Sequence, residues 1–278
     1  MTINYAVAVG IANVRRSPDP ASELVTQALM YMPALVGETS GEWTHVTLSD
    51  YEGWIRSSEL AAPADKDGAA LEGTAVAVVS VTHTPLFVAP QGEATVDTVY
   101  LSTALPLLSP TEHGTTPSER LQVVLPGKRV AAIARNAVSV RQREQVYLRT
   151  PINVVTDHAR DFIDVPYLWG GTSWEGIDCS GFVQLCYRMG GYIIPRDADQ
   201  QHDALACSVT REAIQEGDLI FFGRSAITHV GMALNNKEYI HAEGNRYNRV
   251  VINSFDPADV HYNPRLDEIV WAVKRVVV

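Results

Sequence analysis

Short runs of β-branched and aromatic residues, each broken by turn residues, fill the first half of the chain. Such runs predict strands, because these side chains favour an extended, half-buried backbone. In residues 1–62 the predicted strands are Ala6–Val9, Val14-Arg15, Ala34–Glu38, Trp43–Leu48 and Gly53–Ile55. The pattern predicts a small all-β domain over residues 1–63, followed by a linker at Pro63–Asp67.

Residues 72–145 repeat this theme weakly. The predicted strands include Thr74–Val81, Ala104–Leu108, Leu121–Leu125 and Val130–Ala134, and an exposed hairpin loop is expected at Thr111–Ser118. This segment lacks the tryptophans of the first domain. We therefore expect a second, divergent copy of the same small all-β domain.

The pattern changes from about residue 151. Val154–Asp164 has the periodicity of an amphipathic helix, with one face formed by Val155, His158, Ala159, Phe162 and Ile163. A second helix is expected from Cys179 to Met189. Strand candidates follow at 215–222, 229–234, 238–242, 250–254 and 268–275. Helices first and antiparallel strands afterwards predict an α+β domain over 151–278, with a helical layer on a sheet.

Asp178 stands where the N-cap of the second helix is expected, which makes Cys179 its first residue. The free amides and the positive dipole end of a helix stabilise a thiolate, and thiolate content controls cysteine reactivity. Cys179 is therefore a candidate nucleophile. The alternative is a small buried hydrophobic residue, the commoner role of a lone cysteine.

A thiol nucleophile needs a base, and the base needs a group that orients its ring. His229 opens one strand candidate and His241 lies in the next. On paired antiparallel strands they can be cross-strand neighbours, with Cβ atoms roughly 4.5–5.5 Å apart. We expect His229 to act as base and His241 to fix its tautomer. The other six histidines have no comparable context.

The 278 residues carry a formal net charge of −10, which argues against nucleic acid or an anionic membrane as a partner. The three cysteines, Cys179, Cys186 and Cys207, do not form a disulfide framework. We find no metal-ligand spacing and no phosphate loop, so no metal and no cofactor is expected. Without a signal-like start or an apolar stretch of about 20 residues, a cytoplasmic location is expected, provided that no leader was removed.

Several motifs together resemble a known family. Asp178-Cys179-Ser180-Gly181-Phe182-Val183, His229-Val230-Gly231-Met232 and His241 are similar to the motifs of the NlpC/P60 cysteine peptidases, over roughly residues 151–278. Pro166–Gly171 and Gly217-Asp218-Leu219 also fit. Asn13-Val14-Arg15, Gly41–Val46 and Gly53-Trp54-Ile55 resemble the bacterial SH3 (SH3b) pattern. Two SH3b domains before such a domain resemble the γ-D-glutamyl-L-diamino acid endopeptidases.

The resemblance implies a papain-like catalytic domain and hydrolysis of the amide between γ-D-glutamate and a diamino acid, such as meso-diaminopimelate or lysine, in peptidoglycan stem peptides. It implies Cys179 as nucleophile, His229 as base and then acid, and His241 as orienting group. The Cys179 backbone N–H and the Tyr167 hydroxyl are candidates for stabilising the oxyanion. Asp178 and Ser180 correspond to substrate contacts, and Trp169 lies in a matching segment. Asp197 is either a substrate contact or a helix cap or structural carboxylate.

In the family, a glutamate and a tyrosine of the first SH3b domain bind the free amine of the substrate's L-Ala. The tyrosine corresponds to Tyr51, but Val25 stands at the place of the glutamate, with Glu23 close by. This departure leaves the requirement for a free amine open. We expect an enzyme that recycles muropeptides, acting on tri- or tetrapeptides; its oligomeric state is not predicted.

Three alternatives remain at this point. The chain could be a hydrolase of intact peptidoglycan, a peptide-binding protein with an inert C-terminal domain, or an amidase or acyltransferase using the same triad.

Overall fold

The computed structural model describes residues 5–63, 75–108 and 119–276, which form two compact units, Met1–Val146 and Tyr147–Val278. Most of the linker expected at Pro63–Asp67 and all of the hairpin loop expected at Thr111–Ser118 lie outside the described residues. In the described part of the chain, no helix is long and apolar enough to cross a membrane.

The first half of unit 1 is a strongly bent sheet in the order β3-β2-β6-β5-β4-β1-β7. Its elements are β1 (Tyr5–Val7), β2 (Ile11–Arg15), β3 (Leu24–Leu29), β4 (Pro33–Ser40), β5 (Trp43–Thr47), β6 (Glu52–Arg56), η1 (Ser57–Glu59) and β7 (Leu60–Ala61). Alternate side chains of these strands point inward and form one aliphatic core, including Val14, Val25, Val46 and Ile55. The prediction of five strands missed β3 and β7.

The second half of unit 1 repeats this arrangement. Its elements are β8 (Ala75–Val79), β9 (His83–Val88), β10 (Thr95–Tyr100), β11 (Ala104–Pro106), β12 (Arg120–Leu125), η2 (Pro126–Lys128), β13 (Arg129–Ala134), η3 (Arg135–Ala137), β14 (Val138–Gln142) and η4 (Arg143–Gln145).

Strand by strand, the second half pairs as the first half does. The contacts β1–β4, β1–β7, β2–β3, β2–β6 and β5–β6 correspond to β8–β11, β8–β14, β9–β10, β9–β13 and β12–β13. The pairing of β4 with β5 is reduced in the second copy to one bridge, Leu107 to Val123. The repeat is therefore carried by topology, although the sequence shows it only weakly.

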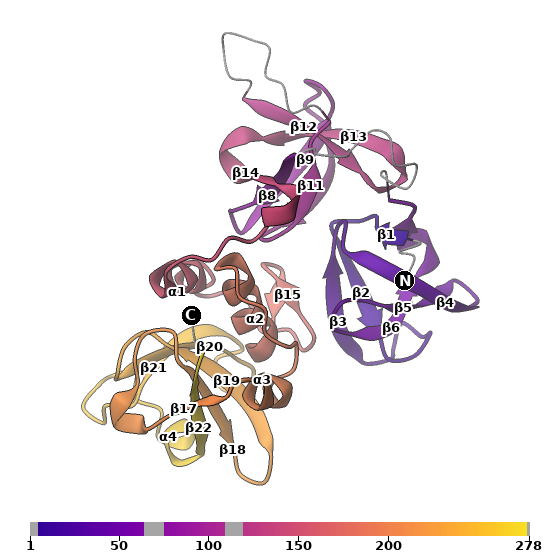
Figure 1. The fold of residues 1–278 in the computed structure, drawn as a ribbon. Helices are drawn as coiled ribbons and strands as arrows, with labels where there is room; N and C mark the ends of the chain where they lie inside the picture. The colour runs from indigo at the N-terminus through magenta and orange to yellow at the C-terminus, as the bar shows by residue number, and fades with distance from the viewer. Residues whose placement is uncertain (1–4, 64–74, 109–118, 277–278) are drawn as a thin grey trace. The chain divides into compact units, whose positions relative to one another are not determined.

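The described part of unit 2 combines four α-helices with a six-stranded antiparallel sheet of order β17-β22-β18-β19-β20-β21 (Figure 1). Its elements are α1 (Ile152–Arg160), β15 (Thr172–Ser173), β16 (Gly176–Ile177), α2 (Cys179–Met189), α3 (Ala198–Ala204), β17 (Cys207–Val209), η5 (Arg211–Ala213), β18 (Leu219–Gly223), β19 (Ile227–Ala233), β20 (Glu238–Glu243), β21 (Arg249–Ser254), α4 (Pro264–Glu268) and β22 (Val270–Arg275). Helix α2 packs on β19 and β20, and α1 packs on α2.

The α+β class and the two N-terminal all-β barrels are confirmed. The helix predicted at 154–164 is α1, which ends at Arg160; Val155, Ala159 and Phe162 are buried as expected, whereas Ile163 lies beyond the helix and is exposed. All five strand candidates of this unit are present, as β18 to β22. The short elements α3, α4 and β17 were not predicted, because segments of three to seven residues show too little periodicity.

Candidate active site

Helix α2 begins where the sequence predicts. The Asp178 carboxylate accepts a hydrogen bond from the Gly181 amide at 2.7 Å, which caps the helix and makes Cys179 its first residue. Gly181 is required here, because a Cβ at this position would stand 2.6 Å from the Gly171 carbonyl oxygen. Cys179 is buried, with 8% of the residue exposed.

A buried ion pair fixes this cap. Arg196, 2% exposed, binds both Asp178 oxygens, with N–O distances of 3.0 and 2.6 Å. The same carboxylate accepts the Gly170 amide and the Ser180 hydroxyl, and Arg196 also donates to the Ser180 oxygen. Asp178 and Ser180 therefore position the helix start; their predicted contacts with substrate stay predictions.

The thiol of Cys179 is neutral in this environment. Burial raises its pKa to about 12, and the negative charge of Asp178 adds to the rise; the Val230 amide, Arg196 and the Ser180 amide oppose it. The stabilisation of a thiolate by the helix start is therefore not sufficient to ionise the thiol in the free protein. The physical reason is that desolvation and the capping carboxylate together outweigh the helix dipole. A neutral thiol needs a base that accepts its proton.

The strand register brings the two histidines together diagonally. Met232 pairs with Ile240 and Ala233 with Tyr239, so the same register sets Gly231, not His229, opposite His241. A Cβ on Gly231 would lie 3.3 Å from the His241 Cβ, which shows how closely the strands approach there. The His229 Nε2 and His241 Nδ1 atoms are nevertheless 2.8 Å apart. The predicted histidine pair is present, with diagonal neighbours in place of directly opposed ones.

The direction of this hydrogen bond follows from the next residue, Asn253. Its amide nitrogen donates to the backbone carbonyls of Ile252 and His261, so its Oδ1 atom is the one that faces His241 Nε2, at 3.0 Å. An amide oxygen only accepts, so His241 Nε2 must carry a proton. Burial lowers the pKa of His241 to about 4, and the imidazole is neutral near pH 7. Its Nδ1 is then a bare acceptor.

The tautomer of His229 follows from that of His241. Because His241 Nδ1 accepts, His229 Nε2 must donate. Burial, His241 and Arg265 lower the pKa of His229 well below its ordinary value, so this ring is also neutral. Its Nδ1 therefore carries a free lone pair. The Phe222 ring, paired with His229 across β18 and β19, packs against the imidazole with ring centroids 5.6 Å apart and limits its rotation.

Cys179 lies close to strand β19, which carries this histidine. The backbone amide of Val230, the residue after His229, donates a hydrogen bond to the Cys179 sulfur. Tyr167 is also close, since the charges of Cys179 and Asp178 act with burial to raise the pKa of its hydroxyl. The Tyr167 hydroxyl is therefore a neutral donor. Its ring packs against Gly244, where a Cβ would stand 2.7 Å from a ring carbon.

The remaining predicted substrate contacts, Trp169, Asp197 and Tyr51, have three different environments in the structure. Trp169 is 61% exposed and lines the same pocket as Tyr167 and His229. Asp197 is the residue before α3, and its side chain makes no capping hydrogen bond there. Tyr51 is half-buried and packs on the core of the first barrel. These three stay predictions as substrate contacts.

Val25 points inward. It is 6% exposed and belongs to the aliphatic core of the first barrel, so it presents no polar group that could bind an ammonium ion. Glu23 lies at the surface and forms an ion pair with Arg16 at 2.6 Å.

Three residues of the site were not found from the sequence: Asn253, Glu243 and Arg265. Asn253 is a buried polar residue in a strand of valines and isoleucine, a signal visible in Val250-Val251-Ile252-Asn253 but without a partner in the sequence. Arg265 comes from α4 and ion-pairs with Glu243 of β20 at 3.5 Å. Over the described residues, no cluster of three or more His, Cys, Asp or Glu side chains could hold a metal ion.

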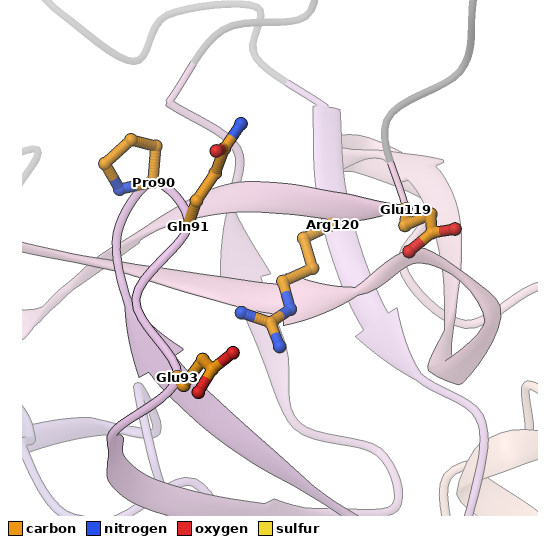
Figure 2. Close-up of a pocket in the computed structure, with 5 residues that line it drawn as sticks. All are labelled: Pro90, Gln91, Glu93, Glu119 and Arg120. Carbon is orange, nitrogen blue, oxygen red and sulfur yellow. The ribbon is translucent and has the colours of Figure 1, made fainter.

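A separate hollow lies in the second barrel, between the ends of β9 and β12. Figure 2 shows Pro90, Gln91, Glu93, Glu119 and Arg120 around it. Arg120 donates to the Gly92 carbonyl at 2.8 Å and stacks on the Phe87 ring at 3.8 Å, so this guanidinium holds the loop together. None of the predicted catalytic residues lines this hollow.

Comparison with known proteins agrees with this architecture. The model of the NlpC/P60 family matches residues 164–266, and that of the bacterial dipeptidyl-peptidase Sh3 domain matches residues 14–60. A γ-D-glutamyl-L-lysine dipeptidyl-peptidase of Bacillus cereus is 30% identical over 236 residues, which are 80% of this chain and 68% of the relative. Dipeptidyl-peptidase 6 of Lysinibacillus sphaericus is 27% identical and aligns over 98% of both chains.

The fold has a close counterpart among solved structures. An NlpC/P60 family protein from Bacillus cereus superposes with a TM-score of 0.85, covering 98% of this chain and 99% of that chain at 23% identity. The match therefore includes both barrels and the catalytic domain. With the cysteine-led helix and the histidine pair in place, and with a relative aligned over most of its length, this chain belongs to the NlpC/P60 family of peptidoglycan-related peptidases.

Proposed function

We propose that the protein is a cysteine peptidase that hydrolyses the γ-D-glutamyl–diamino acid amide bond of peptidoglycan stem peptides. The hydrogen-bond chain from Asn253 through His241 to His229 carries this proposal, because it leaves the free lone pair of His229 at Nδ1. The Cys179 sulfur lies close to the strand that carries this histidine, since the amide of the next residue, Val230, donates a hydrogen bond to it. A neutral thiol and a neutral imidazole form the resting pair.

In the proposed reaction, His229 Nδ1 takes the Cys179 proton as the sulfur attacks the γ-carbonyl carbon of the glutamyl residue. The positive charge that His229 gains is shared through its hydrogen bond with His241. Collapse of the tetrahedral intermediate breaks the C–N bond, and His229 gives its proton to the leaving amine. Water, deprotonated by the same histidine, then hydrolyses the thioester and restores the thiol.

The oxyanion needs donors that stay protonated. The raised pKa of Tyr167 keeps its hydroxyl neutral, and the backbone N–H of Cys179 stands at the free amino end of α2. We assign oxyanion stabilisation to these two groups. Removing one such donor typically lowers kcat by about 100–1,000-fold.

The relatives support the substrate class. Two Bacillus relatives are named γ-D-glutamyl-L-lysine dipeptidyl-peptidase, and the full-length relative from Lysinibacillus sphaericus is named a dipeptidyl-peptidase. We propose that this chain likewise releases an L-Ala-γ-D-Glu dipeptide from free tri- or tetrapeptides, in the cytoplasmic recycling of murein peptides. Because Val25 lies in a barrel core, recognition of the free amine would need another residue, such as Tyr51.

The test is mass spectrometry of the products formed from three peptides: L-Ala-γ-D-Glu-meso-diaminopimelate, its N-acetylated form and a muramoyl-linked form. We expect cleavage at the γ-glutamyl bond of the first peptide. Equal cleavage of the acetylated peptide would mean that no free amine is required. Efficient cleavage of the muramoyl-linked peptide would favour a hydrolase of intact peptidoglycan over a recycling enzyme.

The nucleophile is tested with Cys179→Ala, and Cys207→Ala is the matched control, since Cys207 is a free, half-buried cysteine outside the site. Cys179→Ala should abolish turnover and retain peptide binding, whereas Cys207→Ala should retain full activity. Wild-type protein that binds the peptides but cleaves none of them would identify a binding protein and overturn the proposal.

A further inference from the structure

A pocket of about 350 Å³ opens beside His229, within the size range of about 300–1,000 Å³ typical of small-molecule sites. It lies between the turn that follows β20 and helix α4. Its lining includes Tyr167, Trp169, His229, Asn245 and Arg265. The predicted base and oxyanion donor thus share a wall with a charged side chain that the proposed chemistry does not use.

The exposed charge of this pocket is positive. The Arg265 side chain is 57% exposed, and its ion-pair partner among the described residues is Glu243, at 3.5 Å. Glu243 itself is 3% exposed, and its carboxylate accepts the backbone amides of Arg246 and Tyr247 at 2.6 and 2.8 Å. Both bonds end on Oε2, so the turn engages this oxygen, and Arg265 reaches the other oxygen, Oε1, through one nitrogen. Most of the five N–H donors of the Arg265 guanidinium therefore remain available to an anion. A planar carboxylate fits the geometry of these donors best.

The position of His229 shows which part of a substrate the pocket receives. This step rests on the proposed function, in which His229 protonates the leaving amine. The leaving diamino acid must then begin within hydrogen-bond reach of His229. The pocket that His229 lines is the space into which the rest of that amino acid extends.

We propose that Arg265 binds a carboxylate of the departing diamino acid. Two carboxylates fit this chemistry: the side-chain carboxylate of diaminopimelate, and the C-terminal carboxylate of a tripeptide. The diaminopimelate side chain ends in an ammonium ion beside its carboxylate, whereas the lysine side chain ends in the ammonium ion alone, which Arg265 repels. With the side-chain carboxylate as ligand, the enzyme would prefer diaminopimelate, in contrast to the L-lysine in the names of the two Bacillus relatives; with the C-terminal carboxylate as ligand, either diamino acid would be accepted.

The experiment compares kcat/KM for four peptides: L-Ala-γ-D-Glu-meso-diaminopimelate and L-Ala-γ-D-Glu-L-Lys, each alone and extended by D-Ala. Arg265→Gln removes the charge, and Arg265→Lys retains it without the planar fork. Arg224→Gln is the matched control, since Arg224 is an equally exposed arginine that pairs with Glu268 of α4 and does not line the pocket. Thermal denaturation verifies that each variant is folded.

We expect wild type to prefer the diaminopimelate peptides about tenfold to a hundredfold, as one charge-assisted contact allows. Arg265→Gln should remove this preference through KM, with kcat and the lysine peptides changed less than about threefold. If the C-terminal carboxylate is the ligand, wild type will instead prefer both tripeptides over both tetrapeptides, and Arg265→Gln will remove that preference; this result also supports the proposal and identifies the source.

Other outcomes overturn the inference. If Arg265→Gln leaves all four values unchanged, or lowers all four by the same factor, Arg265 does not bind a substrate carboxylate, while the proposed function stands on the wild-type cleavage. If wild type cleaves none of the four peptides, the proposed function fails and this inference fails with it.

Discussion

Asn253 is expected to control the activity of a base that it does not touch. Its Oδ1 atom accepts the proton of His241 Nε2 at 3.0 Å, and this contact sets the tautomers of both histidines. The change Asn253→Leu keeps a similar size and removes the acceptor. In this variant the His241 tautomer with its proton on Nδ1 becomes more stable, because His229 Nε2 can accept that proton in a hydrogen bond. His229 must now carry its own proton on Nδ1, and it can no longer accept one from Cys179.

The size of the effect follows from two losses. The hydrogen bond contributes about 1 kcal/mol, and a buried N–H without an acceptor costs about 1–3 kcal/mol more. His241 is 0% exposed, so water cannot replace the lost acceptor. The tautomer balance therefore shifts by about 2 kcal/mol at least. With about 1.4 kcal/mol for each factor of ten, the tautomer ratio changes about 30-fold, and kcat/KM should fall by up to this factor.

The assay is steady-state cleavage of the diaminopimelate tripeptide, together with ¹⁵N NMR of the histidine rings, which reports the tautomer directly. Asn253→Asp, which retains an oxygen acceptor, is the matched control and should stay within about tenfold of wild type. Denaturation curves separate this effect from lost stability, because Asn253 also donates to two backbone carbonyls. Unchanged ring tautomers in Asn253→Leu, with kcat/KM within threefold of wild type, would refute the proposed proton arrangement.

The remaining predictions concern stability and can be measured by urea denaturation. The pKa of His241 is about 4 in the folded protein against an ordinary 6.5, so the unfolded chain binds the extra proton between these values. Stability should therefore fall by on the order of 3 kcal/mol as the pH drops from about 6.5 to about 4, and His241→Asn should remove that part of the pH dependence. Arg196→Met leaves the buried Asp178 carboxylate unpaired and should cost about 3–5 kcal/mol, whereas Arg16→Ala, at an exposed ion pair, should cost less than about 1 kcal/mol; equal losses would contradict the assigned burial. Val25→Glu should unfold the first barrel without creating an amine site, because it buries an unpaired charge; a stable variant with tighter peptide binding would show that Val25 faces the substrate.

Local patterns in the sequence were sufficient for the main elements. Asp178 before an apolar helical run predicted the capped start of α2, because capping depends on residues within one turn. Alternating apolar strands and turn residues predicted the α+β unit and the first barrel. The second barrel was harder to detect, since its repeat lies in strand pairing and not in shared residues.

The chemistry of the site was only partly visible in the sequence. The motif spacing singled out Cys179, His229 and His241, but the helix dipole alone did not reveal the protonation of the thiol, because the pKa of the sulfur depends on burial by its whole environment. The contacts that give a role to Asn253, Arg196 and Arg265 form only when separate strands, loops and helices pack together.

The sequence by itself thus determined the elements and the candidate groups, which depend on neighbours in the chain. The tertiary structure decided the protonation, the tautomers and the charge of the pocket. These depend on desolvation and on contacts between residues far apart in the sequence, and no local pattern contains them.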